Sequence, residues 1–274
     1  MKTLPFLILA LSISFLGFSQ ERDLKRVADS IKAEGEKLYR SEWASGHGSS
    51  IFSTNYAEKK LLSGGYFSYE TNKDLVNIFF SKDTDPKVIA TIKFNQKLDD
   101  VKYKIDTTTR KFTDIEKEIY TIREKTVDVI KTDTLFQFHP NTDHNLVPIV
   151  ENGIKKVYII TAQTSSLEVL LGNDYLINFD SENNIINKIK LHNNLIPLPN
   201  GGAQVIEASS HVHLGKTSDF ITATDVCIFK FWKPKITWVI TFVQSAGYVS
   251  AWHFRDEYLD IYTQAQWEKI MKNK

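Results

Sequence analysis

Cysteine is almost absent from this chain, which has one residue of that type, Cys227, among its 274 residues. No disulfide can form within the chain, so packing must supply the stability that small secreted proteins often take from disulfides. Cys227 lies in the apolar stretch VCIFKFW. Because burial among apolar groups raises the pKa of a thiol, we expect this side chain to be buried and inert.

A surplus of charge of either sign is also lacking, since 34 Lys and Arg residues stand against 33 Asp and Glu residues. Such a balanced chain has no general attraction to nucleic acids or acidic membranes. The basic and aromatic segment FKFWKPK is therefore interpreted as the polar face and the end of a core helix. Its lysines are Lys230, Lys233 and Lys235. We expect no nucleic-acid partner.

Three further features are missing, and each excludes a class of protein. No glycine-rich loop connects a strand to a helix, which excludes the common phosphate-binding loops. No G-x-S-x-G motif is present, which excludes the serine nucleophile of that type. No apolar run of about 18 residues follows the N-terminal segment, so we expect no membrane-spanning helix in the mature chain.

The N-terminal segment has the pattern of a secretory signal peptide. Lys2 provides a positive start, and the apolar run LPFLILALSISFLGF follows it without a charge. Gly17 and Ser19 are small residues at the positions required for cleavage before Gln20. A membrane anchor is the alternative, but the run is shorter than the roughly 20 residues that a spanning helix needs. We expect residues 1–19 to be removed and the mature protein to be exported, to the periplasm or outside the cell.

The first half of the mature chain, residues 20–145, is predicted to contain helices around a strand meander. An amphipathic pattern predicts a helix over 23–43, which the segment SGHGSS should end, placing His47 in a surface turn. A short helix is expected over 56–62, and antiparallel strands are expected over 65–106.

A long helix is predicted over 112–138. Thr113 can cap its start, and Glu116 supplies the acidic residue of a capping box. The charged residues of this helix, Glu116 included, are interpreted as a solvated face.

The second half, residues 146–274, alternates between β-rich segments and turns before it ends in a helix. Together the two halves predict an α+β fold with antiparallel or mixed sheets and packed helices. Within the second half, strands are expected over 155–163, 165–172, 174–180, 184–193, 203–214, 236–243 and 248–254, with helices over 222–232 and 263–271.

Two histidines at the end of a predicted strand form the clearest candidate site. Side chains two positions apart on a strand point to the same face, so His211 and His213 can offer two nitrogens to one metal ion. Asp225, at the start of the next helix, can add an oxygen ligand. Three protein ligands with an open fourth position are typical of catalytic zinc.

The stretch HVHLGKTSDFITATDV resembles the motif of the JAMM zinc metallopeptidases, in which H-x-H is followed by Ser-x-x-Asp at the start of a helix. The resemblance covers residues 155–254 and implies a JAMM-like core in the second half. It also implies that His211, His213 and Asp225 hold Zn²⁺ and that Thr222 contacts the water or the oxyanion. The chain departs from the motif by one additional residue before Thr222, by threonine in place of serine, and by Leu214 in place of proline.

The general-base glutamate of that family has two candidates in this sequence. Glu168, in LEVLLG, precedes an apolar strand end that ends in glycine, as the family pattern implies. Glu207 is the rival, because it lies four positions before His211 on the same strand and therefore on the same face. A base close to the water is required for hydrolysis.

A third histidine offers an alternative ligand. If the strand that ends at His192 neighbours the strand of His211, then His192 can replace Asp225 as a ligand. A strand-end histidine with no ligand role is the competing interpretation. Asp174 and Asp180 flank a predicted hairpin strand and are interpreted as turn residues.

The sequence therefore supports a hypothesis of an exported zinc-dependent hydrolase that cleaves peptide or isopeptide amide bonds. The alternative is a non-catalytic binding module on the same fold that recognises a cell-envelope partner. A purely structural secreted protein is a third interpretation, which exposed edges of the strand meander would favour.

Overall fold

The computed structural model describes residues 23–98, 101–163, 168–199, 204–214 and 217–273. Helices and antiparallel or mixed sheets make up an α+β fold, as predicted. The predicted signal peptide, residues 1–19, lies outside the described residues. Among the helices that the structure describes, none is both long and apolar enough to cross a membrane.

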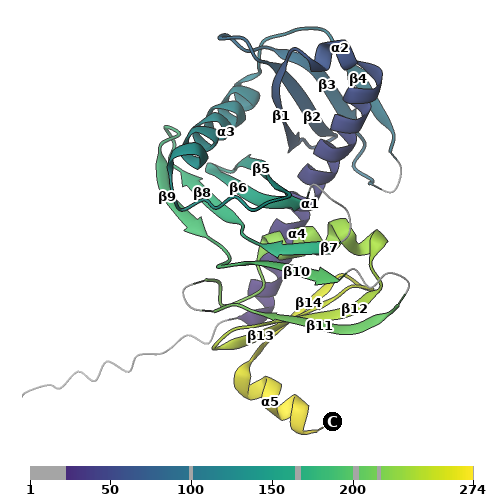
Figure 1. Ribbon diagram of the computed structural model, residues 1–274, viewed down its shortest axis with the longest axis vertical. Coiled ribbons are helices and arrows are strands. Elements are labelled where there is room, and N and C mark those ends of the chain that lie inside the picture. Colours follow the sequence, from purple (N-terminus) through teal and green to yellow (C-terminus); the bar gives the residue numbers. More distant parts are fainter. Residues whose placement is uncertain (1–22, 99–100, 164–167, 200–203, 215–216, 274) are drawn as a thin grey trace, which may run out of the picture.

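One long helix, α1 (Leu24–Asn55), runs the length of the molecule (Figure 1). The prediction that SGHGSS ends this helix was wrong, because α1 continues straight through these residues. A Cβ at Gly48 would overlap the Asn77 side chain, so this glycine allows helix and sheet to approach closely instead of breaking the helix. His47 lies inside the helix, where its ring stacks on Trp43 with 4.0 Å between centroids.

The strand meander of the first half forms a four-stranded antiparallel sheet in sequential order, as predicted. Its strands are β1 (Ser63–Glu70), β2 (Leu75–Ser81), β3 (Val88–Phe94) and β4 (Tyr103–Asp106). The two helices of this region after α1 are α2 (Ala57–Lys60) and α3 (Asp114–Thr132). α3 begins at the predicted capping box but ends six residues before the predicted end, position 138.

A second antiparallel sheet has the order β5-β6-β8-β9. Its strands are β5 (Thr142–Glu151), β6 (Ile154–Gln163), β8 (Tyr175–Phe179) and β9 (Ile185–Lys190). Beside it, β7 (Glu168–Gly172) pairs with β10 (Leu195–Pro199) in a two-stranded sheet. β10 was not predicted from the sequence, because its two prolines are unusual in a strand.

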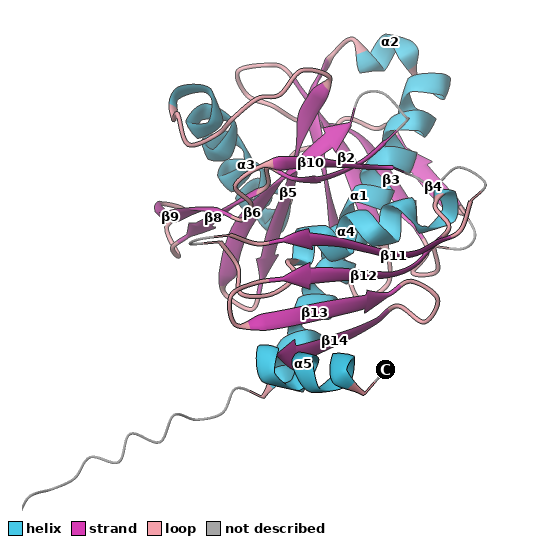
Figure 2. Ribbon diagram, turned by 60° about the horizontal axis from the view of Figure 1, so that its bottom comes forward, coloured by secondary structure: helices cyan, strands magenta, loops and turns pink. Residues whose placement is uncertain are grey.

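The last sheet has the order β11-β12-β13-β14 and forms one face of the molecule (Figure 2). Its strands are β11 (Ile206–Val212), β12 (Trp238–Gln244), β13 (Tyr248–His253) and β14 (Tyr258–Thr263). β11 and β12 are parallel, so the chain crosses over between them through α4 (Ala223–Trp232) and a 3-10 turn, η1 (Lys233–Lys235). α5 (Gln264–Lys272) closes the chain.

α1 connects the two ends of the molecule. Its first turns pack on α4 and β14, where Leu38 is completely buried in a core shared with Phe229 and Trp252. Its last turns pack on the first sheet, where Phe52 stacks on Phe79. α1 therefore contributes to the cores of both halves of the chain.

Candidate metal-binding site

The end of β11 presents two histidines to the interior. His211 and His213 are buried, whereas Val212 between them is half exposed, so the alternation of a strand places both rings on one face, as predicted. The centroids of the two rings lie 5.2 Å apart. His213 follows the last residue of β11, and its backbone N–H donates to the Gln244 carbonyl at 2.8 Å, which extends the strand pairing to this residue.

The start of α4 fixes the carboxylate of Asp225. Thr222 is the N-cap, and its hydroxyl oxygen accepts from the Asp225 backbone N–H at 3.1 Å. The Asp225 Oδ2 atom in turn accepts from the Thr222 backbone N–H and hydroxyl, both at 2.9 Å. This capping box holds Oδ2 from the side of α4, while both carboxylate oxygens face the histidines, with His192 Nε2 3.3 Å from Oδ2 and 3.2 Å from Oδ1. The predicted contact of Thr222 with a water or an oxyanion stays a prediction, since its described contacts are with Asp225 and Thr224.

Two further buried groups, His192 and Asp174, reach the same place from the β8–β9 hairpin. Asp174 precedes β8 and His192 follows β9, and the Leu191 backbone N–H donates to the Asp174 carbonyl at 2.9 Å. Asp174 lies in the short connection between β7 and β8, as a turn residue would, but its side chain is completely buried, which that interpretation did not anticipate. Extending the register of this hairpin by one pair beyond Tyr175 and Lys190 places Leu191 opposite Asp174, so the next residue, His192, comes near Asp174.

The ligand atoms of His192, His213 and Asp225 lie within 4.8 Å of one another, close enough to hold a metal ion. His192 Nε2 is 3.2 Å from Asp225 Oδ1, and His213 Nε2 is 3.7 Å from Asp225 Oδ2. His211 Nε2 is 4.0 Å from Asp225 Oδ1, at the edge of this group. The structure thus adds His192 to Asp225, whereas the sequence alternative had His192 replace it.

The surroundings of the second ring nitrogen differ among the three clustered histidines. His213 Nδ1 lies 3.0 Å from the Phe220 carbonyl, which fixes the proton on Nδ1 and leaves the lone pair on Nε2. His192 Nδ1 faces Asp174 Oδ2 at 3.4 Å, and Asp174 is itself held by the Thr161 backbone N–H at 2.8 Å. Neither nitrogen of His211 has a hydrogen-bond partner among the described residues.

Burial and charge act in opposite directions on the pKa values of this cluster. Burial would lower the pKa of His192, but Asp225 and Asp174 on either side raise it to about 10. Burial lowers the pKa of His211 to about 4, so this ring is neutral at pH 7. Burial would raise the pKa of the Asp225 carboxyl, but His192 and the other two imidazoles hold it well below its usual range.

Several polar atoms of the cluster are buried without a hydrogen bond within the described part of the chain. They include Asp225 Oδ1, His213 Nε2 and the two nitrogens of His211. Buried polar atoms are nearly always paired with protein, water or an ion, so such a group of orphans indicates a species bound among them. A small pocket of about 40 Å³, lined in part by His192 and His213, provides space beside them for one or two waters.

The two candidate glutamates lie on different strands. Glu207 is exposed on β11, while His211 on the same strand is buried, and four strand residues separate them by about 13 Å. Glu168 begins β7, but its side chain is outside what the structure describes. Among the described side chains, no glutamate is hydrogen-bonded or ion-paired to the histidines of the cluster or to Asp225.

Cys227 is buried two residues after Asp225 on α4, as predicted, and burial raises the pKa of its thiol well above the usual value. Of the predicted zinc ligands, His213 and Asp225 lie close enough to His192 to hold a metal ion with it, whereas His211 lies at the edge of the group. The JAMM-like core stays a prediction. No family model, no curated protein and no solved structure matches this chain.

Proposed function

We propose that this chain is an exported zinc-dependent hydrolase that cleaves peptide or isopeptide amide bonds, with His192, His213 and Asp225 as its zinc ligands. The observation that carries the proposal is the paired orientation of the two histidines. Each directs Nε2 at the Asp225 carboxylate and has an oxygen near Nδ1, which for His213 is the hydrogen-bonded Phe220 carbonyl at 3.0 Å and for His192 is Asp174 Oδ2 at 3.4 Å. Histidines that ligate a metal have this arrangement, because the acceptor fixes the tautomer and makes the ligating nitrogen more basic.

The spacing and the chemistry of the donors fit zinc. A tetrahedral ion with bonds of about 2.0–2.1 Å separates its ligand atoms by roughly 3.4 Å. The separation of 3.2 Å between His192 Nε2 and Asp225 Oδ1 is close to this value, and the ligand atoms of His192, His213 and Asp225 all lie within 4.8 Å of one another. Two imidazoles and one carboxylate suit zinc better than calcium or magnesium, which prefer oxygen ligands alone.

Three ligands leave one coordination position for chemistry. Zinc in such a site activates a water and polarises a carbonyl oxygen. Thr222 positions the Asp225 carboxylate through Oδ2, and Asp174 orients the His192 ring. A groove of about 570 Å³ beside α1 is lined in part by Leu191, which precedes His192, and by Thr222, which holds Asp225, and it is the proposed place for the substrate.

Export and the JAMM resemblance belong to the same proposal. A signal peptide over residues 1–19 would place the enzyme outside the cytoplasm, where an envelope peptide or another exported protein is the substrate class available.

A non-catalytic role for the metal is the second candidate, and the depth of the site favours it. The side chains of His192, His211, His213 and Asp225 are each at most 7 % exposed. If His211 completes a set of four protein ligands, the site is closed, as in structural zinc sites. The ion would then stabilise a binding module, and no hydrolysis would follow.

Metal analysis of the purified protein tests zinc binding, which both candidate functions require. We expect about one zinc ion per chain, by analogy with single-ion sites, and its loss in the His213→Ala and Asp225→Asn proteins. His253→Ala is the matched control, since this histidine lies on β13 and faces Asp260 at 3.5 Å, away from the cluster. A folded wild-type protein that neither contains nor takes up zinc would rule out both candidates.

His211→Ala separates the two candidates. In the hydrolase, three ligands suffice, so this variant keeps its zinc. In the closed structural site, it loses zinc as His213→Ala does. The hydrolase further requires cleavage of a peptide mixture, detected by mass spectrometry, that a chelator stops and added Zn²⁺ restores. Zinc lost from His211→Ala together with absent cleavage would establish the structural role instead.

A further inference from the structure

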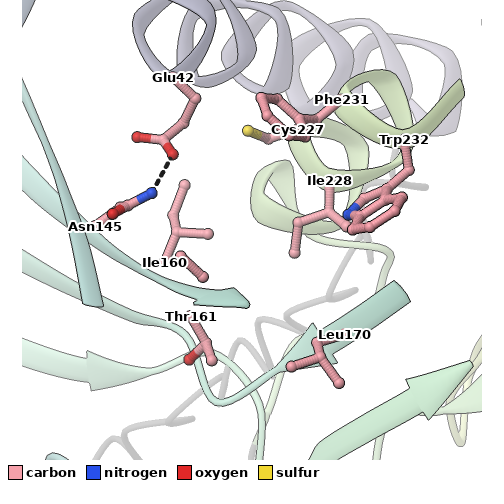
Figure 3. A pocket seen from close by; sticks show the side chains of 10 residues that line it. Glu42, Asn145, Ile160, Thr161, Leu170, Cys227, Ile228, Phe231 and Trp232 are labelled. Carbon is pink, nitrogen blue, oxygen red and sulfur yellow. Dashed lines mark hydrogen bonds between the residues drawn. The ribbon is translucent and has the colours of Figure 1, made fainter. Parts of the chain in front are cut away.

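A second cavity, separate from the metal cluster, lies between α1, α4 and the β5–β7 region (Figure 3). Its volume is about 190 Å³, and it shares no residue with the cluster. Ile160, Leu170 and Cys227 contribute apolar walls, and Phe231 and Trp232 at the end of α4 contribute aromatic ones. Phe231 is 43 % exposed, so the cavity reaches the surface at this end of α4.

One charged side chain, Glu42 of α1, lines this apolar cavity. Figure 3 shows its carboxylate at one side of the pocket, hydrogen-bonded to Asn145 of β5 and across from the side chains of α4. The Asn145 Nδ2 atom donates to Glu42 Oε2 at 2.6 Å. Within the described part of the chain this amide is the hydrogen-bond partner of Glu42, and no lysine, arginine or histidine pairs with it.

A carboxylate in apolar surroundings needs a counter-charge or loses its charge. The nearest basic residue on α4 does not supply one, because Lys230 is paired with Glu36 and Glu257. Glu42 thus differs from the surface acids of α1, such as Asp29 and Glu36, which have lysine partners.

We propose that this cavity binds a small organic amine, whose ammonium group pairs with Glu42 and whose apolar body packs against Phe231 and Trp232. The ammonium would supply the counter-charge, and the aromatic rings favour a cationic ligand over a neutral one of the same shape. An anionic ligand is excluded by the negative charge of Glu42. The site is independent of the zinc proposal, since its residues and its ligand are different.

The test uses cyclohexylamine as the probe and cyclohexanol as its neutral counterpart, titrated into the full-length mature protein and followed by protein NMR. A fragment of this size that fills the cavity should bind with a dissociation constant on the order of 0.1–1 mM. Cyclohexanol should bind at least tenfold more weakly. Because burial raises the pKa of Glu42 to about 7, the amine should bind about tenfold more tightly at pH 8 than at pH 6.

Two variants locate the binding at this cavity. Glu42→Gln keeps an oxygen that can accept from Asn145 but removes the charge, so it should bind the amine at least tenfold more weakly and without dependence on pH. Glu36→Gln removes a carboxylate from the same helix outside the cavity and should bind as the wild type does. Leu170→Trp fills the cavity and should abolish binding.

Equal binding of cyclohexylamine and cyclohexanol to the wild type would overturn the proposal, and this comparison needs no variant to fold. Undiminished binding to Glu42→Gln, or no binding at millimolar concentrations, would overturn it as well.

Discussion

Two helices of this molecule begin with the same capping motif, in which a capping threonine is followed three residues later by a buried acidic residue. Thr113 and Glu116 begin α3, and Thr222 and Asp225 begin α4. Both carboxylates are completely buried, and both accept a hydrogen bond from the backbone N–H of their threonine. The local geometry is the same, so what differs between the two sites is what surrounds each carboxylate.

Glu116 is fully compensated by its neighbours. Arg110 donates to its two oxygens at 2.6 Å and 2.8 Å, and the Tyr69 hydroxyl donates at 2.9 Å. Burial would raise the pKa of Glu116, but the bonds from Arg110, Thr113 and Tyr69 lower it. Every lone pair has a partner, and nothing further is needed to hold this charge in the interior.

Asp225 has no arginine or lysine partner among the described residues. Three imidazoles surround it instead, and its Oδ1 atom has no hydrogen bond. An imidazole can offer a lone pair as well as a proton, whereas a guanidinium can only donate. The difference between the two sites is that the partners of Glu116 donate hydrogen bonds to it, whereas imidazoles around Asp225 lie close enough to hold a metal ion together with it, as proposed above.

The largest expected effect is the response of stability to zinc. At a free zinc concentration about 1,000 times the dissociation constant, binding should raise the free energy of unfolding by about 4 kcal/mol. Asp225→Asn should lose this response, and Glu116→Gln should keep it even if its baseline stability is lower. Urea unfolding with zinc and with a chelator measures both. If Asp225→Asn keeps the full zinc response, Asp225 is not a zinc ligand and the proposed difference between Asp225 and Glu116 is wrong.

The next effect is the cost of removing the partner of Glu116. Arg110→Met leaves a buried carboxylate without its cation, which should lower the free energy of unfolding by about 2–4 kcal/mol. The range is at the lower end for a buried pair because the Arg110 side chain is 34 % exposed. Zinc content should be unchanged, and a matched change in zinc content would show that the two sites are coupled.

Glu42 sharpens the comparison as a part-buried acid that is paired with neither arginine nor histidine among the described residues. Burial raises its pKa from 4.5 to about 7, so between these values the folded protein keeps a proton that the unfolded chain releases. Stability should therefore fall as the pH rises through this window and level off above pH 7. Glu42→Gln should gain on the wild type by about 1–3 kcal/mol from pH 5 to pH 8.

The difference between the two proteins isolates Glu42, because other titrating groups contribute equally to both. The ionisable neighbours Tyr66 and Cys227 do not interfere, since burial raises the pKa of each. If the stability curves of the wild type and Glu42→Gln are parallel over this range, Glu42 is ionised throughout and pairs with a cation. This outcome would contradict the prediction.

Much of the candidate site could be predicted from the sequence because it is built from local patterns. Strand alternation placed His211 and His213 together, and the capping pattern placed Asp225 at the start of α4. The position of His192 beside Asp225 could not be predicted from the local sequence, because it depends on where the β8–β9 hairpin packs relative to α4. The buried pairing of Glu116 was missed for the same reason, since its charge is compensated by Arg110, outside the helix.

For the fold too, the features that depend on local sequence were predicted, and those that depend on tertiary contacts were not. The α+β class and the sequential meander follow from periodicity and turn residues, and both are confirmed. The end of α1 was placed too early because Gly46 and Gly48 resemble a helix terminator, whereas Gly48 is required by the close approach of Asn77. A glycine that allows close packing and a glycine that ends a helix cannot be told apart without the partner strand.

The smallest expected effect compares the two caps directly. Thr113→Ala and Thr222→Ala each remove one capping hydroxyl, and each should lower the free energy of unfolding by about 1 kcal/mol when zinc is absent. With zinc present the two should diverge, because the Thr222 hydroxyl also fixes Asp225 Oδ2 at 2.9 Å. Loss of such a positioning contact should weaken zinc binding by about tenfold or more in Thr222→Ala. Thr113→Ala should bind zinc as the wild type does, and equal zinc affinities in the two variants would mean that Thr222 is a helix cap and nothing more.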